Sequence, residues 1–233
     1  MIDVEFLEYP SVEEMVEATA LAVAAIIEAA IVERDQALLA FPGGNTPKPI
    51  MAELAAAKLQ WERVTIFPGD ERLVPRDHRL SNCGTLESDF ASTGARIVPL
   101  AGENADYREA GKLADKRLHQ LEWPPDLVWL GMGMDGHTAS IFPGPDLENA
   151  LNGPTERRAV GVMPDPLPVD APVARVTLTK AAIVEARSLM ITISGPSKRE
   201  LIVRAIAGGQ SSPYPIGNVI AYARRRVQIF CSN

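Results

Sequence analysis

The sequence predicts an α/β protein whose central, mostly parallel sheet is flanked by helices on both faces, giving three layers. Short apolar runs alternate along the chain with longer segments of helical periodicity, which is the pattern of β-α-β crossovers. Parallel sheets of this kind are covered on both faces, which suits runs as apolar as Ala37–Phe41 and Leu189–Ile193. Polar or glycine-rich segments follow several of these runs directly, and ligands in such sheets bind at that end of the strands.

The composition of the 233-residue chain fits one large domain or two small ones, since 46% of its residues are hydrophobic. No linker-like segment divides it, so we expect a single domain over residues 1–233. Lys and Arg number 23 against 30 Asp and Glu, and the net charge of −7 argues against nucleic acid or an anionic membrane as a partner. Cys83 and Cys231 lack a metal-binding spacing, so neither a disulfide framework nor a zinc site is expected.

The N-terminal segment favours a soluble protein. Residues 1–5 have neither the basic region nor the apolar core of a signal peptide. The alanine-rich stretch 18–31 is interrupted by Glu28 and flanked by acidic residues, so a soluble helix explains it better than a membrane span. We therefore expect a cytoplasmic protein without a membrane or nucleic-acid partner, present as a monomer or a weak homo-oligomer.

In the first half of the chain, the predicted helices carry start signals. Ser11, with Glu14 three residues later, forms a capping box for a long helix whose apolar residues recur at helical spacing. Thr46 is a good N-cap and Pro47 suits the first helical position, so another helix begins there. A further helix is predicted at 81–90, and strands are predicted at Val4–Leu7, Ala37–Phe41, Val64–Phe67 and Arg96–Leu100.

In the second half, residues 107–121 show helical periodicity, and Trp123-Pro124-Pro125 stops that helix. Ser197 and Glu200 form a second capping box, which places Lys198 in the first turn of a helix. A cation there opposes the helix dipole unless an anion is bound in front of it. Strands are predicted at Leu127–Leu130, Ala159–Met163, Ala174–Leu178, Leu189–Ile193 and Val227–Cys231.

The segment Gly43-Gly44-Asn45-Thr46 joins a predicted strand to a predicted helix. Its glycines leave backbone N–H groups free, and the helix dipole adds partial positive charge, so a phosphate or carboxylate would bind well there. No Gly-Lys-Ser/Thr follows, so the segment is not a Walker A sequence. A Gly-Gly turn of this kind is also common as an ordinary connector.

The segment Asp70-Glu71-Arg72 lies just beyond the apolar end of the strand predicted at 64–67. One interpretation is a solvated turn of charged residues. In the other, Asp70 positions a reactant or an imidazole, and Arg72 holds an anion or stabilises a developing oxyanion. The isolated His78 and His119 are expected at the surface.

The strongest catalytic candidates follow Leu130, in a turn with the three glycines Gly131, Gly133 and Gly136. Asp135 and His137 lie in this turn, and an acid with an imidazole at the carboxyl end of a strand suits general base catalysis near neutral pH. The alternative is a glycine-rich turn with one structural histidine. The carboxyl ends of parallel strands share one edge of a sheet. We therefore expect this turn at the same edge as Gly43–Thr46, Asp70–Arg72 and the segment around Lys198.

Several of these segments together resemble the glucosamine-6-phosphate isomerase/6-phosphogluconolactonase family, and the lactonases within it. They are, in order, Gly43–Pro47, Asp70–Arg72 with Ser81-Asn82, Gly131–Gly144, Arg175–Thr179 and Gly195–Lys198. The Asp-Gly-His-Thr-Ala-Ser block inside the third segment is the most specific of these features. The resemblance implies a fold similar to those of glucosamine-6-phosphate deaminase and ribose-5-phosphate isomerase.

The resemblance also implies hydrolysis of a phosphosugar lactone, 6-phospho-D-glucono-1,5-lactone, to 6-phosphogluconate in the oxidative pentose phosphate pathway, without a metal or other cofactor. We hypothesise that His137 is the general base that activates water and that Asp135 or Asp70 orients it. Arg72, with backbone N–H groups near Gly136, would stabilise the tetrahedral oxyanion. Substrate binding would fall to Gly43, Gly44, Asn45, Thr46, Gly136, Arg175 and Lys198, of which the last two hold the phosphate.

Other interpretations of single residues and of the whole chain stay open. Taken alone, Arg175 would be an edge-strand arginine that packs its aliphatic stem. Ser140 lies outside a Gly-x-Ser-x-Gly elbow, which argues against a serine nucleophile. An aminosugar-phosphate deaminase or isomerase would need a tyrosine-like residue in place of Arg72 and a carboxylate soon after the histidine, where Ile141-Phe142-Pro143 supplies none. A sugar-phosphate sensor domain would need a helix-turn-helix segment and a basic face.

Overall fold

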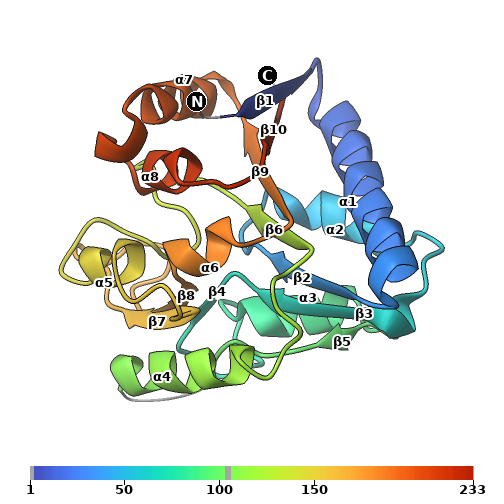
Figure 1. The fold of residues 1–233 in the computed structure, drawn as a ribbon, viewed down its shortest axis with the longest axis horizontal. Coiled ribbons are helices and arrows are strands. Elements are labelled where there is room, and N and C mark those ends of the chain that lie inside the picture. Colours follow the sequence, from blue (N-terminus) through green and yellow to red (C-terminus); the bar gives the residue numbers. More distant parts are fainter. Residues whose placement is uncertain (1–2, 103–105, 233) are drawn as a thin grey trace.

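The computed structural model describes residues 3–102 and 106–232. Within them a seven-stranded sheet forms the centre, and a three-stranded sheet lies beside it (Figure 1). The strand order in the large sheet is β1 (Val4–Tyr9), β10 (Val227–Ser232), β9 (Ser188–Ser194), β6 (Leu127–Leu130), β2 (Ala37–Phe41), β3 (Val64–Pro68) and β5 (Arg96–Ile97). Each neighbouring pair in this order runs parallel, which confirms the predicted type of sheet.

Side chains of the large sheet alternate between two separate hydrophobic cores. In β2, Leu39 and Phe41 belong to one core, whereas Leu38 and Ala40 belong to the other. The first core is closed by α1 (Val12–Arg34), α2 (Pro47–Ala55) and α3 (Asn82–Asp89). The second is closed by α4 (Tyr107–Leu118), α7 (Pro196–Ala207), α8 (Pro215–Ala221) and the small sheet. The predicted three layers are therefore confirmed, and burial on both faces explains the apolar strand segments.

Helix α1 begins as predicted, because the Ser11 hydroxyl accepts a hydrogen bond from the Glu14 amide at 3.2 Å. By length and composition alone, α1 is apolar enough to cross a membrane. In this fold it packs one face against the sheet, while Leu21 and Val32 on its surface remain exposed. The buried residues of α1 are Met15, Val16, Thr19, Ala20, Val23, Ile27, Ala30 and Ile31. The helix is thus a core element of the protein.

The small sheet is antiparallel, with the strand order β4 (Asp70–Arg72), β8 (Arg175–Leu178) and β7 (Ala159–Val162). The interpretation of the segment Asp70–Arg72 as a solvated turn is wrong, because Asp70 pairs with Thr177 and Arg72 pairs with Arg175. Three charged residues carry no apolar pattern, so only the partner strand makes this segment a strand. The interpretation of Arg175 as an edge-strand residue is also wrong, because β8 is the middle strand.

Some element boundaries differ from the predictions. The helix predicted at 107–121 ends at Leu118. Neither Thr46 nor Ser197 caps its helix through the side chain, and the second capping box is not formed because Gly195 is the N-cap of α7. The short elements η1 (Trp61–Arg63), α5 (Leu147–Leu151), α6 (Lys180–Val184), η2 (Gly209–Ser211) and α8 were not predicted. Segments of this length are too short to show a helical period.

Candidate active site

A pocket opens at the carboxyl end of four adjacent strands, β9, β6, β2 and β3. Its walls come from the loops after β2 and β6, from β4 and β8, and from the first turn of α7. The strand order changes direction between β2 and β6, and such switch points are where open α/β sheets bind ligands. The predicted site residues that line the pocket are Gly43, Gly44, Asn45, Thr46, Asp70, Arg72, His137, Arg175 and Lys198.

The loop between β2 and α2 lines the pocket with residues Gly43 to Thr46. The N–H groups of Gly44, Asn45 and Thr46 have no backbone acceptor in the part of the chain that the structure describes. They precede the first turn of α2, where the helix dipole adds partial positive charge. The loop is fixed by α3, since a Cβ at Gly43 would lie 2.1 Å from Oδ1 of Asn82. Free N–H groups at the start of a helix are typical of anion-binding sites, so the predicted role of this loop stays consistent with its geometry.

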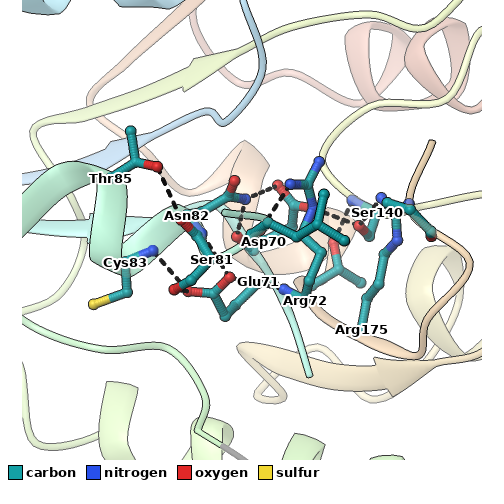
Figure 2. Close-up of polar contacts among 12 residues, drawn as sticks. Asp70, Glu71, Arg72, Ser81, Asn82, Cys83, Thr85, Ser140 and Arg175 are labelled. Carbon is teal, nitrogen blue, oxygen red and sulfur yellow. Dashed lines mark hydrogen bonds and ion pairs between the residues drawn. The ribbon is translucent and has the colours of Figure 1, made fainter. Parts of the chain in front are cut away.

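Asp70 lies in the pocket wall and is held by side chains from two other segments (Figure 2). The Ser140 hydroxyl donates to its Oδ2 at 2.5 Å, and the Asn82 carboxamide donates to its Oδ1 at 3.3 Å. Ser140 is fully buried, and its Oγ also accepts a hydrogen bond from Arg175 at 3.3 Å. Ser140 therefore links a carboxylate to a guanidinium, which leaves its hydroxyl engaged rather than open to a substrate.

Glu71 faces α3 rather than the pocket. Its carboxylate accepts hydrogen bonds from the backbone amides of Asn82 and Cys83, at 2.8 and 2.7 Å, and from the Ser81 hydroxyl at 3.3 Å (Figure 2). Burial raises the pKa of Glu71, although the backbone amide donors act in the opposite direction. The carboxylate thereby holds the start of α3, which keeps the Asn82 carboxamide against Asp70.

The pocket combines three cationic side chains, Arg72, Arg175 and Lys198, with one carboxylate, Asp70. Arg175 is only 4% exposed, and among the described residues neither its Nε nor that of Arg72 has a hydrogen-bond partner. Within the same residues Lys198 makes no side-chain hydrogen bond or ion pair. Burial lowers the pKa of both Arg175 and Lys198. A chain of net charge −7 therefore concentrates positive charge here, as an anionic ligand requires.

His137 lines the pocket, and Asp135 contacts it through its carboxylate. Nδ1 of His137 lies 2.5 Å from Oδ1 of Asp135, which also accepts the His137 backbone amide at 3.1 Å. Nε2 is therefore the ring nitrogen left for a ligand. Partial burial opposes ionisation of Asp135, but the hydrogen bond and the charge of His137 outweigh it and lower the pKa of Asp135. Of the two carboxylates proposed to orient the imidazole, only Asp135 contacts it, whereas Asp70 is engaged by Ser140 and Asn82.

The glycines of this loop are needed for close packing. A Cβ at Gly133 would lie 2.2 Å from the His137 ring. Gly136 has a φ of 79°, and a Cβ there would lie 2.6 Å from Tyr214. The N–H of Gly136 donates to the Gly133 carbonyl at 3.1 Å, and its carbonyl accepts from the Ile216 amide at 3.0 Å. The predicted place of Gly136 at the substrate-binding surface is therefore wrong, because its polar groups are used within the fold.

Phe142 was not predicted to belong to the site. Its ring stacks on the His137 imidazole, with centroids 4.1 Å apart and an interplanar angle of 28°. The Arg175 guanidinium carbon lies 4.9 Å from the centroid of the same ring. The supporting contacts of Ser140 were also missed, because its partners Asp70 and Arg175 lie 70 and 35 residues away in the sequence. The sequence signalled a role for Phe142 and Ser140 only through their position inside the segment Gly131–Gly144.

The other histidines lie outside the pocket, as predicted. His78 is exposed and accepts a hydrogen bond from the Leu80 amide at 3.2 Å. The side chain of His119 is 43% exposed beside Asp115. Within residues 3–102 and 106–232, no group of three His, Cys, Asp or Glu side chains is arranged to hold a metal ion.

A family model described as glucosamine-6-phosphate isomerases/6-phosphogluconolactonase matches residues 10–229 of the chain. The chain belongs to this family. One relative within it, the 6-phosphogluconolactonase of Mesorhizobium japonicum, is 38% identical over 228 residues, which cover 95% of this chain and 92% of that protein. The 6-phosphogluconolactonase of Rhizobium meliloti is 36% identical, with 98% of this chain and 97% of that protein covered. The predicted family resemblance is confirmed.

Solved structures agree with this membership of the glucosamine-6-phosphate isomerase/6-phosphogluconolactonase family. A 6-phosphogluconolactonase from Shewanella baltica superposes with a TM-score of 0.89 at 29% identity, covering 100% of both chains. A monomeric glucosamine-6-phosphate deaminase superposes with a TM-score of 0.81 at 20% identity, covering 99% of this chain and 98% of that chain. The second similarity shows a shared fold, as the sequence predicted. The similarity to ribose-5-phosphate isomerase stays a prediction.

Proposed function

We propose that the chain hydrolyses 6-phospho-D-glucono-1,5-lactone to 6-phospho-D-gluconate in the oxidative pentose phosphate pathway. The observation that carries the proposal is the His137–Asp135 pair, which faces a pocket with an excess of cationic side chains. Relatives named 6-phosphogluconolactonase, up to 38% identical, support the same substrate class. A buried cation and free backbone amides suit the phosphate of such a substrate, and an imidazole suits its carbonyl carbon.

In this proposal His137 acts as the general base. Its Nε2 takes a proton from water as the water oxygen attacks C1 of the lactone, and the ionised Asp135 stabilises the imidazolium that forms. Arg72 stabilises the oxyanion on the tetrahedral carbon, a contribution whose loss typically costs about 100- to 1000-fold in rate. The bond between C1 and the ring oxygen then breaks, and His137 returns the proton to that oxygen, which becomes a hydroxyl group. A lactone is an activated ester, so the proposal needs neither a metal ion nor a covalent nucleophile.

The phosphate is assigned to Arg175 and Lys198, together with the backbone amides of Asn45 and Thr46. Arg175 supports this assignment because it is buried and its Nε has no hydrogen-bond partner among the residues that the structure describes. Lys198 supports it because a cation in the first turn of α7 opposes the helix dipole, a cost that a bound dianion removes. The glycine-rich loop adds N–H donors at the start of α2. Phosphate and carbonyl are thus bound by different parts of the pocket.

A deaminase or isomerase of the same family is the main rival. That chemistry would require a carboxylate soon after the histidine for ring opening, and this chain has Phe142 in that stretch. It would also require a tyrosine-like residue in place of Arg72. A sugar-phosphate sensor would bind its ligand without turnover. Release of acid from the lactone, without release of ammonia from glucosamine-6-phosphate, therefore separates the three functions.

The decisive experiment compares His137→Ala with His119→Ala. Acid release from freshly prepared lactone is followed at constant pH, with spontaneous hydrolysis subtracted. We expect His137→Ala to lose at least about 100-fold in kcat, since general base catalysis contributes about 100- to 10,000-fold. His119→Ala is the matched control, because its side chain is exposed and outside the pocket. A kcat of His137→Ala close to that of the wild type would remove His137 as the base.

We further propose that the enzyme works in the cytoplasm as a monomer or weak homo-oligomer, without a cofactor and without a membrane or nucleic-acid partner. The support is the net charge of −7 and the packing of α1 against the sheet. Light scattering should give a mass near 25.2 kDa at low concentration. Activity should survive prolonged dialysis against a chelator, and loss of activity that added Zn²⁺ or Mg²⁺ restores would contradict the metal-free mechanism.

A further inference from the structure

Phe142 lies beside two side chains to which the proposed function gives different roles. Its ring stacks on His137 with centroids 4.1 Å apart, and the guanidinium carbon of Arg175 lies 4.9 Å from its centroid. Phe142 itself is not among the residues that line the pocket. It therefore contacts the proposed base without contacting the substrate, which is the position of a residue that acts through another.

We propose that Phe142 is a positioning residue that sets the plane of the His137 imidazole. The proposal rests on the proposed role of His137 as the base. A single hydrogen bond from Nδ1 to Asp135 anchors one atom of the imidazole ring. Rotation of the ring about the Cβ–Cγ bond of His137 otherwise has a broad energy minimum. Stacking against a flat aromatic face restricts that rotation. The hydrogen bond and the stacking contact together aim Nε2 at the place where water attacks.

The fold holds Phe142 rigidly enough for this role. The chain reverses immediately before it, where the Ile141 amide donates to the Thr138 carbonyl at 2.9 Å and Ala139 adopts a φ of 48°. Ile141 is fully buried, so the turn is anchored in the core. The Ser140 amide donates to the Thr177 hydroxyl on β8 at 3.1 Å. This turn places the ring of Phe142 over the imidazole of His137, five positions earlier in the chain.

The test compares Phe142→Leu, which keeps apolar volume but removes the flat face, with Phe142→Tyr, which keeps the face. We expect kcat on the fresh lactone to fall about tenfold in Phe142→Leu. The reason is that a small displacement of a catalytic group from its productive position lowers the rate steeply. Phe142→Tyr should stay within about twofold of the wild type. Phe142→Met serves as a second non-aromatic variant if the leucine variant melts at a much lower temperature.

A spectroscopic measurement tests the stacking without reference to activity. The chain has only three histidines, so the imidazole proton resonances of His137 can be assigned by their loss in His137→Ala. In the wild type these protons should be shifted upfield by the ring current of Phe142. The shift should be retained in Phe142→Tyr and lost in Phe142→Leu. A merely structural role would lower the melting temperature of Phe142→Leu and leave the kcat of the folded variant unchanged, whereas a positioning role lowers kcat in the folded variant.

Three results would overturn the proposal. They are a kcat of Phe142→Leu and Phe142→Met within about twofold of the wild type, a Phe142→Tyr variant as slow as Phe142→Leu, and an unshifted His137 resonance in the wild type. A wild-type protein inactive on the lactone would instead refute the proposed function. In that case the upfield shift still shows whether the ring of Phe142 stacks on the imidazole of His137.

Discussion

Replacement of Gly133 by alanine adds one methyl group beside the proposed catalytic pair. The new Cβ would lie 2.2 Å from Nδ1 and Cε1 of His137, and 2.6 Å from Oδ1 of Asp135. The φ of Gly133 is outside the left-handed region, so the backbone itself accepts alanine. The loop has little room to retreat, because the N–H of Gly133 donates to the carbonyl of His137 at 3.0 Å. The side-chain contact is therefore the main effect.

The size of this effect follows from the distances. Ordinary van der Waals contact begins at 3.4 Å, so the imidazole of His137 has to move by about 1.2 Å from the 2.2 Å separation. A misplacement of about 1 Å costs about 100-fold in rate, which corresponds to about 2.7 kcal/mol of transition-state stabilisation. KM should change by less than about threefold, because the residues assigned to the phosphate lie on β8, on α7 and before α2.

The matched control is Gly131→Ala, in the same loop, where a Cβ has no heavy atom within 4 Å. Both variants are assayed for kcat and KM on fresh lactone, with spontaneous hydrolysis subtracted, and their unfolding is followed by calorimetry. Gly133→Ala should lose far more activity than Gly131→Ala, with both unfolding near the wild-type temperature. The reasoning is refuted if Gly133→Ala keeps wild-type kcat, or if both variants lose activity equally.

Two further substitutions test the roles assigned to Ser140 and Lys198. Ser140→Ala should keep lactonase activity within about tenfold of the wild type while lowering the free energy of unfolding by about 1–3 kcal/mol, because Asp70 loses a buried donor. Complete loss of activity at an unchanged melting temperature would instead indicate a nucleophilic serine. Lys198→Ala should raise KM about tenfold or more and leave kcat within about twofold. Burial lowers the pKa of Lys198 and a bound anion raises it again, so affinity for 6-phosphogluconate should fall as the pH rises through the lowered pKa of Lys198 in the free protein. Titration calorimetry should show this fall in the wild type and not in Lys198→Ala, and an equal fall in both would contradict the assignment.

The large sheet could be predicted because the information for it is local. Strands β2 and β6 coincide with the predicted Ala37–Phe41 and Leu127–Leu130, since short apolar runs that end at glycine or proline mark buried strands. The convergence of the Gly43 loop and His137 on one pocket followed from the same pattern, because the carboxyl ends of parallel strands share an edge.

Long-range contacts inside the site could not be predicted in this way. The charged segment Asp70–Arg72 carries no apolar period, and it is a strand only because β8 pairs with it. The same pairing buries Arg175, which local reasoning placed on an edge strand. The N–H of Gly136 looked free in a glycine-rich turn, but the turn closes on itself and uses it.

Local patterns were thus enough to establish the α/β fold, the edge of the sheet that carries the pocket and the residue types that meet there. The partner of each side chain was decided by the folded chain alone: Asp135 rather than Asp70 for His137, and Phe142 against both His137 and Arg175. Those partners depend on strand order, on register and on how tightly the loop after β6 turns. None of these is recorded in the periodicity of any single segment, because they arise from packing between segments far apart in the chain.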